Sequence, residues 1–294
     1  MTVQYDGTDY HGWQEQRLPR GERGEKDTRC RFPEGPEGGG AETTPGLFFA
    51  SATPILSREG RGGSTAEAAA GQAVRTVQGT LVEVLAAILG DRPRVEGAGR
   101  TDAGVHALGQ VAAFDAARDI PLDRLQAALN SRLPADIAVA DLAEVPPTFR
   151  PAADAVSKHY RYRLHVGRTK PVLEARYVWH WYRPIGVGPM QEAARLLAGR
   201  HDFASFQSRG GEREDTVREL HRLEVAERGQ EVHFDVEGDR FLYRMVRNLV
   251  GTLVEVGSGH RPPAWVEAAL EARDRRAAGP CAPPQGLCLM AVRY

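Results

Sequence analysis

The feature that most limits how this 294-residue chain can fold is a long segment near its N-terminus, residues 17–75. Eleven of its 59 residues are glycine and five are proline, and they follow no repeating period. Such a composition is typical of low-complexity or disordered sequence, because it buries too little apolar surface to offset the loss of chain entropy on folding. We therefore expect this segment to be disordered.

The rest of the chain alternates between helical and strand-like patterns of apolar residues. Thr76 is a suitable N-cap for a first helix and Gly90 a suitable stop. Apolar spacing predicts further helices at 122–129, 190–197, 242–256 and 264–273. Strands are predicted near 2–5, 94–95, 110–114, 137–145, 156–165, 177–182 and 286–292, with a hairpin at 220–226 and 231–236.

The helix at 242–256 carries the strongest helical pattern in the sequence. Its apolar residues fall on one face, and the pattern places Arg244, Asn248, Gly251 and Glu255 opposite, with Arg247 near the polar edge. Strand–helix alternation with hairpins indicates an α+β architecture of two similar halves that share a sheet. Prolines at 146, 147 and 151 mark the boundary, so we expect halves at residues 1–150 and 151–294.

A run of small residues from Gly97 to Ala107 encloses one arginine, one acid and one histidine: Arg100, Asp102 and His106. Its glycines let the backbone turn tightly and approach another molecule closely. A carboxylate two residues from an arginine suits a nucleophile or a base that a neighbouring cation keeps ionised. An ordinary loop, in which the aspartate caps a turn and the arginine is solvated, explains the same residues on local chemistry alone.

The longer string GRTDAGVHA, residues 99–107, resembles the active-site motif of the TruA-type tRNA pseudouridine synthases. Other motifs of that family follow in its order: Tyr5-Asp6-Gly7-Thr8-Asp9-Tyr10-His11-Gly12-Trp13-Gln14, Thr76-Val77-Gln78-Gly79, Lys158-His159-Tyr160-Arg161-Tyr162, His201 to Phe206, and Met245 to Gly251. The resemblance covers nearly the whole chain apart from residues 17–75. In the family only a handful of residues separate the first two of these motifs, so the resemblance implies that this segment is an insertion looping out of the first domain, the main departure from the family's pattern. A second departure is that Thr2–Tyr5 matches the end of a first strand whose earlier residues, usual in the family, are missing here.

The resemblance implies two ferredoxin-like halves that form a shared mixed or antiparallel sheet, with helices on one side and an RNA-binding cleft between the halves. It implies an isomerase that converts uridine to pseudouridine in the anticodon stem-loop of tRNA, at positions 38–40, and that works as a homodimer. Asp102 is then the catalytic carboxylate, acting covalently or by deprotonating the ribose. Tyr160, Arg100 and Arg247 are then the substrate-binding residues, with Arg100 or Arg247 paired to Asp102.

Bulk properties agree with such a protein and exclude several other classes. The sequence contains no phosphate-binding loop, dinucleotide fingerprint or metal-ligand spacing, so we expect no cofactor and no metal. Three cysteines, at 30, 281 and 288, form no CxxC pair, which indicates neither a disulfide framework nor a zinc site. No apolar run approaches the roughly 20 residues that span a bilayer. We expect a cytoplasmic protein that binds no membrane.

Residues 157–183 combine seven Lys or Arg with six Tyr or Trp and only one acid. Basic groups between aromatic rings offer phosphate contacts and stacking surfaces together, as RNA binding requires. The same pattern also arises from strands with one solvated basic face and one aromatic core face. The sequence by itself does not choose between these two interpretations.

Two other functions compete with the synthase. One is a catalytically inactive RNA-binding protein of the same fold, which the long insertion and the short first strand keep open. The other is a carboxylate-dependent glycosidase acting on nucleosides, a reaction that ordinarily uses two carboxylates about 5–10 Å apart. Glu96 and Asp115 are the nearest acids in sequence, and neither falls in the Asp102 loop. The sequence therefore favours the synthase.

Overall fold

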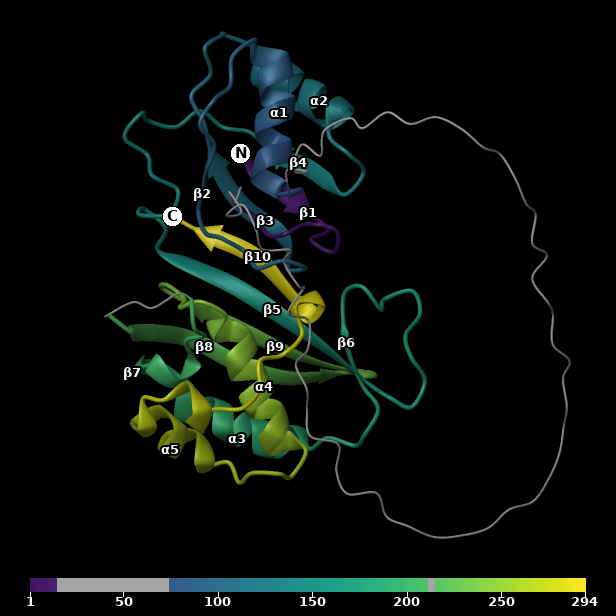
Figure 1. The fold of residues 1–294 in the computed structure, drawn as a ribbon, viewed down its shortest axis with the longest axis vertical. Helices are drawn as coiled ribbons and strands as arrows, with labels where there is room; N and C mark the ends of the chain where they lie inside the picture. Colours follow the sequence, from purple (N-terminus) through teal and green to yellow (C-terminus); the bar gives the residue numbers. More distant parts are fainter. Residues whose placement is uncertain (15–73, 211–214) are drawn as a thin grey trace, which may run out of the picture. The chain divides into compact units, whose positions relative to one another are not determined.

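The computed structural model describes residues 1–14, 74–210 and 215–294. The predicted disordered segment, apart from its last two residues, therefore lies outside the described residues. The described residues form a mixed sheet with helices packed against it (Figure 1). The strands are β1 Thr2–Tyr5, β2 Glu96–Gly97, β3 His106–Ala113, β4 Ile137–Asp141, β5 Ser157–Val166, β6 Trp179–Trp181, β7 Gly199–Asp202, β8 Val217–Arg228, β9 Glu231–Gly238 and β10 Leu287–Arg293. The helices are α1 Val77–Leu89, α2 Leu122–Arg132, α3 Val187–Leu197, α4 Met245–Gly257 and α5 Trp265–Ala272.

The last strand, β10, lies in the middle of the sheet, between β3 and β5. The strand order is β4-β1-β3-β10-β5-β9-β8-β7, with β2 on β3 and β6 on β5. Strand β10 runs parallel to β3 and antiparallel to β5, so strands from early and late parts of the chain meet at its two edges (Figure 1). Its register places Leu289 opposite both Ala107 on β3 and Tyr160 on β5. This pairing brings the region of the Asp102 loop next to the region of Tyr160.

Several predicted elements are confirmed with their terminating residues. Thr76 caps α1 by accepting a hydrogen bond from the Gly79 N–H at 3.1 Å, and Gly90 ends the helix with φ of 84°. The left-handed backbone at Gly90 satisfies a last helical carbonyl without a Cβ clash. The predicted hairpin is formed by β8 and β9, with Gly229 in the turn at φ of 62°.

The observed ends of two strands differ from the predicted ends, because pairing with other strands determines where these strands begin or end. Strand β3 begins at His106 rather than at Gln110, because His106 and Ala107 pair with β10. Strand β4 ends at Asp141 instead of residue 145, because its partner β1 is four residues long and its last pair is Thr2 with Asp141. These partners lie far away in the sequence, so a local pattern does not contain them.

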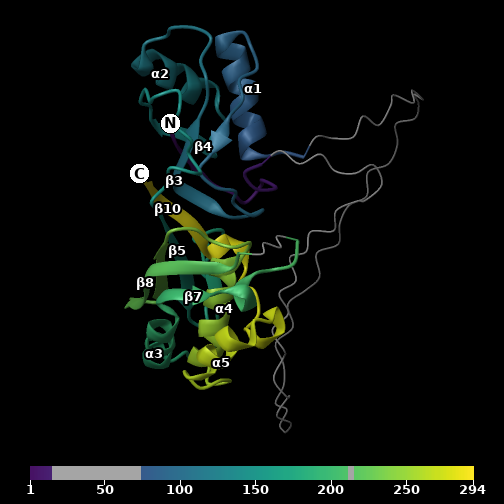
Figure 2. The same cartoon turned by 90° about the vertical axis from the view of Figure 1, so that its left-hand side faces the viewer.

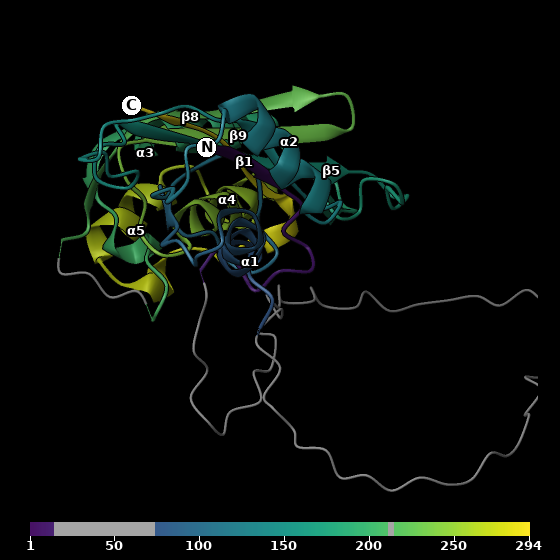
Figure 3. The same ribbon diagram turned by 90° about the horizontal axis from the view of Figure 1, so that it is seen from above.

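Helix α4 departs most from its prediction. It begins at Met245, because Arg244 adopts a left-handed conformation with φ of 58°. The expected polar face does not point to solvent: Arg247 is 5% exposed, and Asn248 and Gly251 are buried. The helix packs against α3, and Gly251 touches the carbonyl of Pro280, where no side chain would fit. Two further views place α4 and α5 on one side of β8 and β9 (Figure 2, Figure 3).

No helix among the described residues is long and apolar enough to cross a membrane.

Candidate active site

The Asp102 loop leads into β3 and is fixed by hydrogen bonds on each side of the aspartate. The Tyr5 and Thr101 hydroxyls are 2.8 Å apart and buried, and the Trp13 N–H donates to the Thr101 carbonyl at 3.1 Å. The Gln110 amide donates to the Gly99 carbonyl at 2.8 Å, and beyond the aspartate the Gly104 N–H donates to the Tyr10 carbonyl at 3.3 Å. Buried hydrogen bonds of this kind hold a loop in one conformation, because breaking any one leaves a polar group without water.

A glycine in the N-terminal motif allows this close packing. Gly12 has φ of 93°, and a Cβ at this position would lie 2.5 Å from the Thr101 carbonyl oxygen. A side chain at position 12 would therefore both strain the backbone and displace the residue next to Asp102. The N-terminal motif and the Asp102 loop thus form one packed unit, although 90 residues separate them in the sequence.

Arg247 is the cation that pairs with Asp102. Its Nη1 lies 2.8 Å from Asp102 Oδ2, with side-chain exposures of 6% for the arginine and 18% for the aspartate. Arg247 Nε donates to the Ala282 carbonyl at 2.7 Å, and the Ala282 N–H donates to the Arg247 carbonyl at 3.0 Å. The segment that precedes β10 therefore orients the guanidinium. A carboxylate held so by a buried cation is fixed in direction.

The other two predicted site residues differ in placement. Tyr160 is 8% exposed on β5, and its ring meets the edge of Phe241 with centroids 5.1 Å apart. Burial raises its pKa, and Tyr5 and Asp102 raise it further, so the phenol stays protonated at neutral pH. Arg100 is exposed and pairs with no described carboxylate. Of the two arginines that the sequence offers as partners of Asp102, the structure brings in Arg247.

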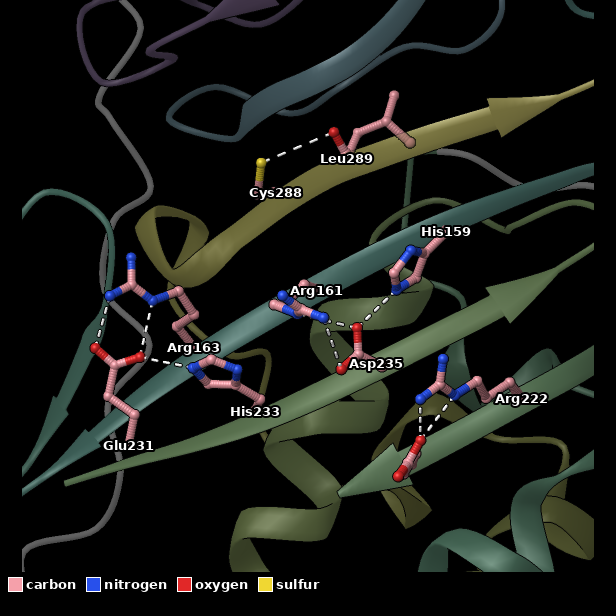
Figure 4. Close-up of polar contacts among 10 residues, drawn as sticks. His159, Arg161, Arg163, Arg222, Glu231, His233, Asp235, Cys288 and Leu289 are labelled. Carbon is pink, nitrogen blue, oxygen red and sulfur yellow. Dashed lines mark hydrogen bonds and ion pairs between the residues drawn. The ribbon is translucent and has the colours of Figure 1, made fainter. Parts of the chain in front are cut away.

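The basic and aromatic segment 157–183 separates by face along β5. Tyr160 and Tyr162 are buried, whereas Arg161 and Arg163 emerge on the opposite face, where acids of β9 neutralise them (Figure 4). Asp235 accepts from Arg161 at 3.0 Å and lies 2.6 Å from His159 Nε2. Glu231 binds Arg163 at 2.6 and 2.9 Å and His233 at 2.7 Å. On this strand the pattern reflects an aromatic core face and a charged outer face.

Sequence reasoning missed the residues that support the site: Tyr5, Thr101, Gln110 and Ala282. Tyr5 and Thr101 lie within the motifs that carry the family resemblance, and this position could have identified them. Ala282 acts through its backbone and carries no signal in its side chain. The Gln110 amide is completely buried on β3, a placement that a strand of small and apolar residues does not reveal.

A buried arginine–carboxylate pair is a feature that carboxylate-dependent enzymes share with structural ion pairs. The chain belongs to the tRNA pseudouridine synthase family, whose family model matches residues 60–151 and 193–294. This confirms the family that the motifs indicate.

The relatives extend over most of the chain. The tRNA pseudouridine synthase A of Myxococcus xanthus is 46% identical over 220 residues, which cover 74% of this chain and 83% of that protein. The protein of the same name from Geotalea daltonii is 43% identical over 219 residues, 74% of this chain and 90% of the relative. That of Moorella thermoacetica is 45% identical over 219 residues, 74% of this chain and 89% of the relative.

Proposed function

We propose that this protein converts uridine to pseudouridine in the anticodon stem-loop of tRNA, at positions 38–40, with Asp102 as its catalytic carboxylate. The observation that carries the proposal is the 2.8 Å pair of Asp102 with Arg247, beside Tyr160, in a member of a tRNA pseudouridine synthase family. The pair joins residues 145 positions apart in the chain.

The reaction breaks the bond between ribose C1′ and uracil N1, turns the base, and joins C1′ to C5. The proton leaves C5 and N1 ends with a proton, so electrons and atoms balance without an oxidant or reductant. Asp102 supplies either a covalent partner for the sugar or base, or a base for the ribose. Both roles require a carboxylate held in a fixed direction, which the contact with Arg247 provides.

Tyr160 and Arg100 complete the proposed site. The raised pKa of Tyr160 favours stacking with the target uracil over proton removal by a phenolate. A uracil in a stem must leave its stack before it can react, which costs a few kcal/mol that stacking and phosphate contacts offset. Arg100, exposed beside Asp102, is placed to meet the RNA backbone.

The proposed setting follows the same resemblance. Residues 1–150 would form one ferredoxin-like half with Asp102, and residues 151–294 a second half with Tyr160 and Arg247, with the RNA in a cleft between them. We propose a cytoplasmic homodimer, with one tRNA spanning both subunits. Light scattering after size-exclusion chromatography tests this directly, because a mass of one chain in solution contradicts it.

The decisive experiment measures tritium release from tRNA that contains [5-³H]uridine, for the wild type and for Asp102→Ala. Pseudouridine formation expels the C5 hydrogen, so we expect release by the wild type and none by the variant. A folded wild type that binds tRNA without releasing tritium would instead indicate the inactive RNA-binding protein. Release that survives the substitution would remove Asp102 from the reaction. Mapping the modified position tests the anticodon assignment.

A further inference from the structure

Arg244, immediately before α4, has a backbone conformation that its residue type rarely adopts. Its φ is 58° and its ψ is 14°, and among the described non-glycine residues only Arg273 also has a positive φ. Arg273 ends α5, where left-handed residues are common, and its Nε pairs with Asp202 at 3.0 Å. Arg244 has neither reason. Residues held in such a conformation cluster at functional sites, so its side chain is of interest.

The side chain of Arg244 has no acidic partner among the described residues. Its Nε is buried and makes no hydrogen bond there, although a guanidinium remains charged at any physiological pH. The guanidinium carbon lies 4.9 Å from the ring centre of Tyr243, whose side chain is partly exposed. A cation stacked on an aromatic ring keeps its planar edge available for an anion.

The position of Arg244 relates it to the reaction. Three residues earlier, Phe241 contacts the ring of Tyr160, and three residues later Arg247 pairs with Asp102. Arg244 is therefore flanked on both sides in sequence by residues that contact the proposed catalytic groups.

We propose that Arg244 binds a backbone phosphate of the RNA next to the target uridine. This inference rests on the proposed function, because it requires a tRNA substrate. A guanidinium matches phosphate oxygens with two parallel hydrogen bonds, which a lysine ammonium does not reproduce. The phosphate contact positions the nucleotide whose base reacts at Asp102, while Arg247 remains committed to the carboxylate.

The test compares Arg244→Asn, Arg244→Lys and Arg273→Asn with the wild type. Asparagine tolerates a positive φ, so the first variant removes the charge without adding backbone strain. We measure tRNA affinity at several salt concentrations, together with Tm. We expect Arg244→Asn to weaken binding about tenfold at low salt and to reduce the slope of log Kd against log salt by about one. Arg244→Lys should keep the slope, and Arg273→Asn should keep both affinity and slope.

Three results would overturn the inference. In the first, Arg244→Asn retains wild-type affinity and slope. In the second, its Tm falls while its slope is unchanged, as expected if the guanidinium only stabilises the fold. In the third, Arg273→Asn loses as much affinity as Arg244→Asn. Failure of the proposed function is distinguishable, because it appears in the wild type as absence of tritium release, whatever residue 244 is.

Discussion

The two faces of the sheet carry similar ion pairs that do different work. On one face Asp102 has a single described cationic partner, Arg247, and is 18% exposed. On the other face Asp235 has two hydrogen-bond partners, Arg161 and His159, and is 8% exposed (Figure 4). A carboxylate engaged in three hydrogen bonds, as Asp235 is, has little acceptor capacity left, whereas one held by a single cation keeps capacity for a substrate. This difference in acceptor capacity, rather than the presence of an arginine, distinguishes the two aspartates.

The largest expected difference between the faces is in turnover. Asp102→Asn should reduce kcat for tritium release by about 10²–10⁴-fold or more, because it removes the group that acts on the nucleotide. Asp235→Asn should leave kcat unchanged and lower the free energy of unfolding, because it leaves Arg161 and His159 without their partner. Equal losses of kcat in the two variants would contradict the distinction.

Substitution of the two arginine partners, Arg247 and Arg161, should likewise affect kcat on one face and not on the other. Arg247→Lys loses the Nε donor that reaches the Ala282 carbonyl, so the cation and Asp102 shift relative to each other. A displacement of this size can reduce kcat about 10²-fold. Arg161→Lys is the matched change on the other face and should leave kcat at the wild-type value. Steady-state kinetics of both variants, with circular dichroism to verify folding, check the prediction.

At acid pH the ion pairs of the outer face, centred on Asp235, should show their contribution to the free energy of unfolding. Burial by itself would raise the pKa of Asp235, but hydrogen bonds from His159 and Arg161 outweigh it and lower the pKa to about 2. Since the folded value lies below the unfolded value of 3.8, the carboxylate stabilises the fold above pH 3.8 and loses that contribution as pH falls toward 2. The loss is about 2 kcal/mol.

Urea unfolding between pH 5 and pH 2.5 measures this contribution. We expect the wild type to lose stability more steeply than Asp235→Asn over this range, because the amide has no proton to gain. Parallel curves for the two proteins would mean that the network contributes nothing to acid stability.

The smallest expected effect concerns the anchor of the Asp102 loop. Tyr5→Phe and Thr101→Val each remove one side of a buried hydrogen bond, and a double-mutant cycle should give a coupling of about 1 kcal/mol in unfolding free energy. Both variants should also lower kcat, because Thr101 precedes Asp102. Tyr177→Phe removes an exposed hydrogen bond to Asp6 and serves as the control. A kcat as low in the control as in Tyr5→Phe would show that the anchor is not special.

The sequence predicted much of the fold because most elements carry their own signals. The first helix was readable from its cap, its apolar spacing and its terminal glycine, which are all local. The sequence predicted helix α4 correctly as a helix, but the prediction that its polar face is exposed to solvent was wrong. Polar residues indicate a solvent-exposed face only where no other part of the protein covers them. Asn248 donates to the Phe206 carbonyl, and Arg247 reaches Asp102, so both remain polar while buried.

By itself, the sequence determined the family, the order of the elements and the candidate residues Asp102, Tyr160, Arg100 and Arg247. It could do so because motif spacing and apolar periodicity are properties of neighbouring residues. Only the tertiary structure decided that Arg247, and not Arg100, pairs with Asp102. That choice depends on β10 pairing with both β3 and β5 and on the Ala282 carbonyl, which are contacts between segments distant in sequence. Ion pairing falls off steeply with distance, so it is settled where the chain brings charges together.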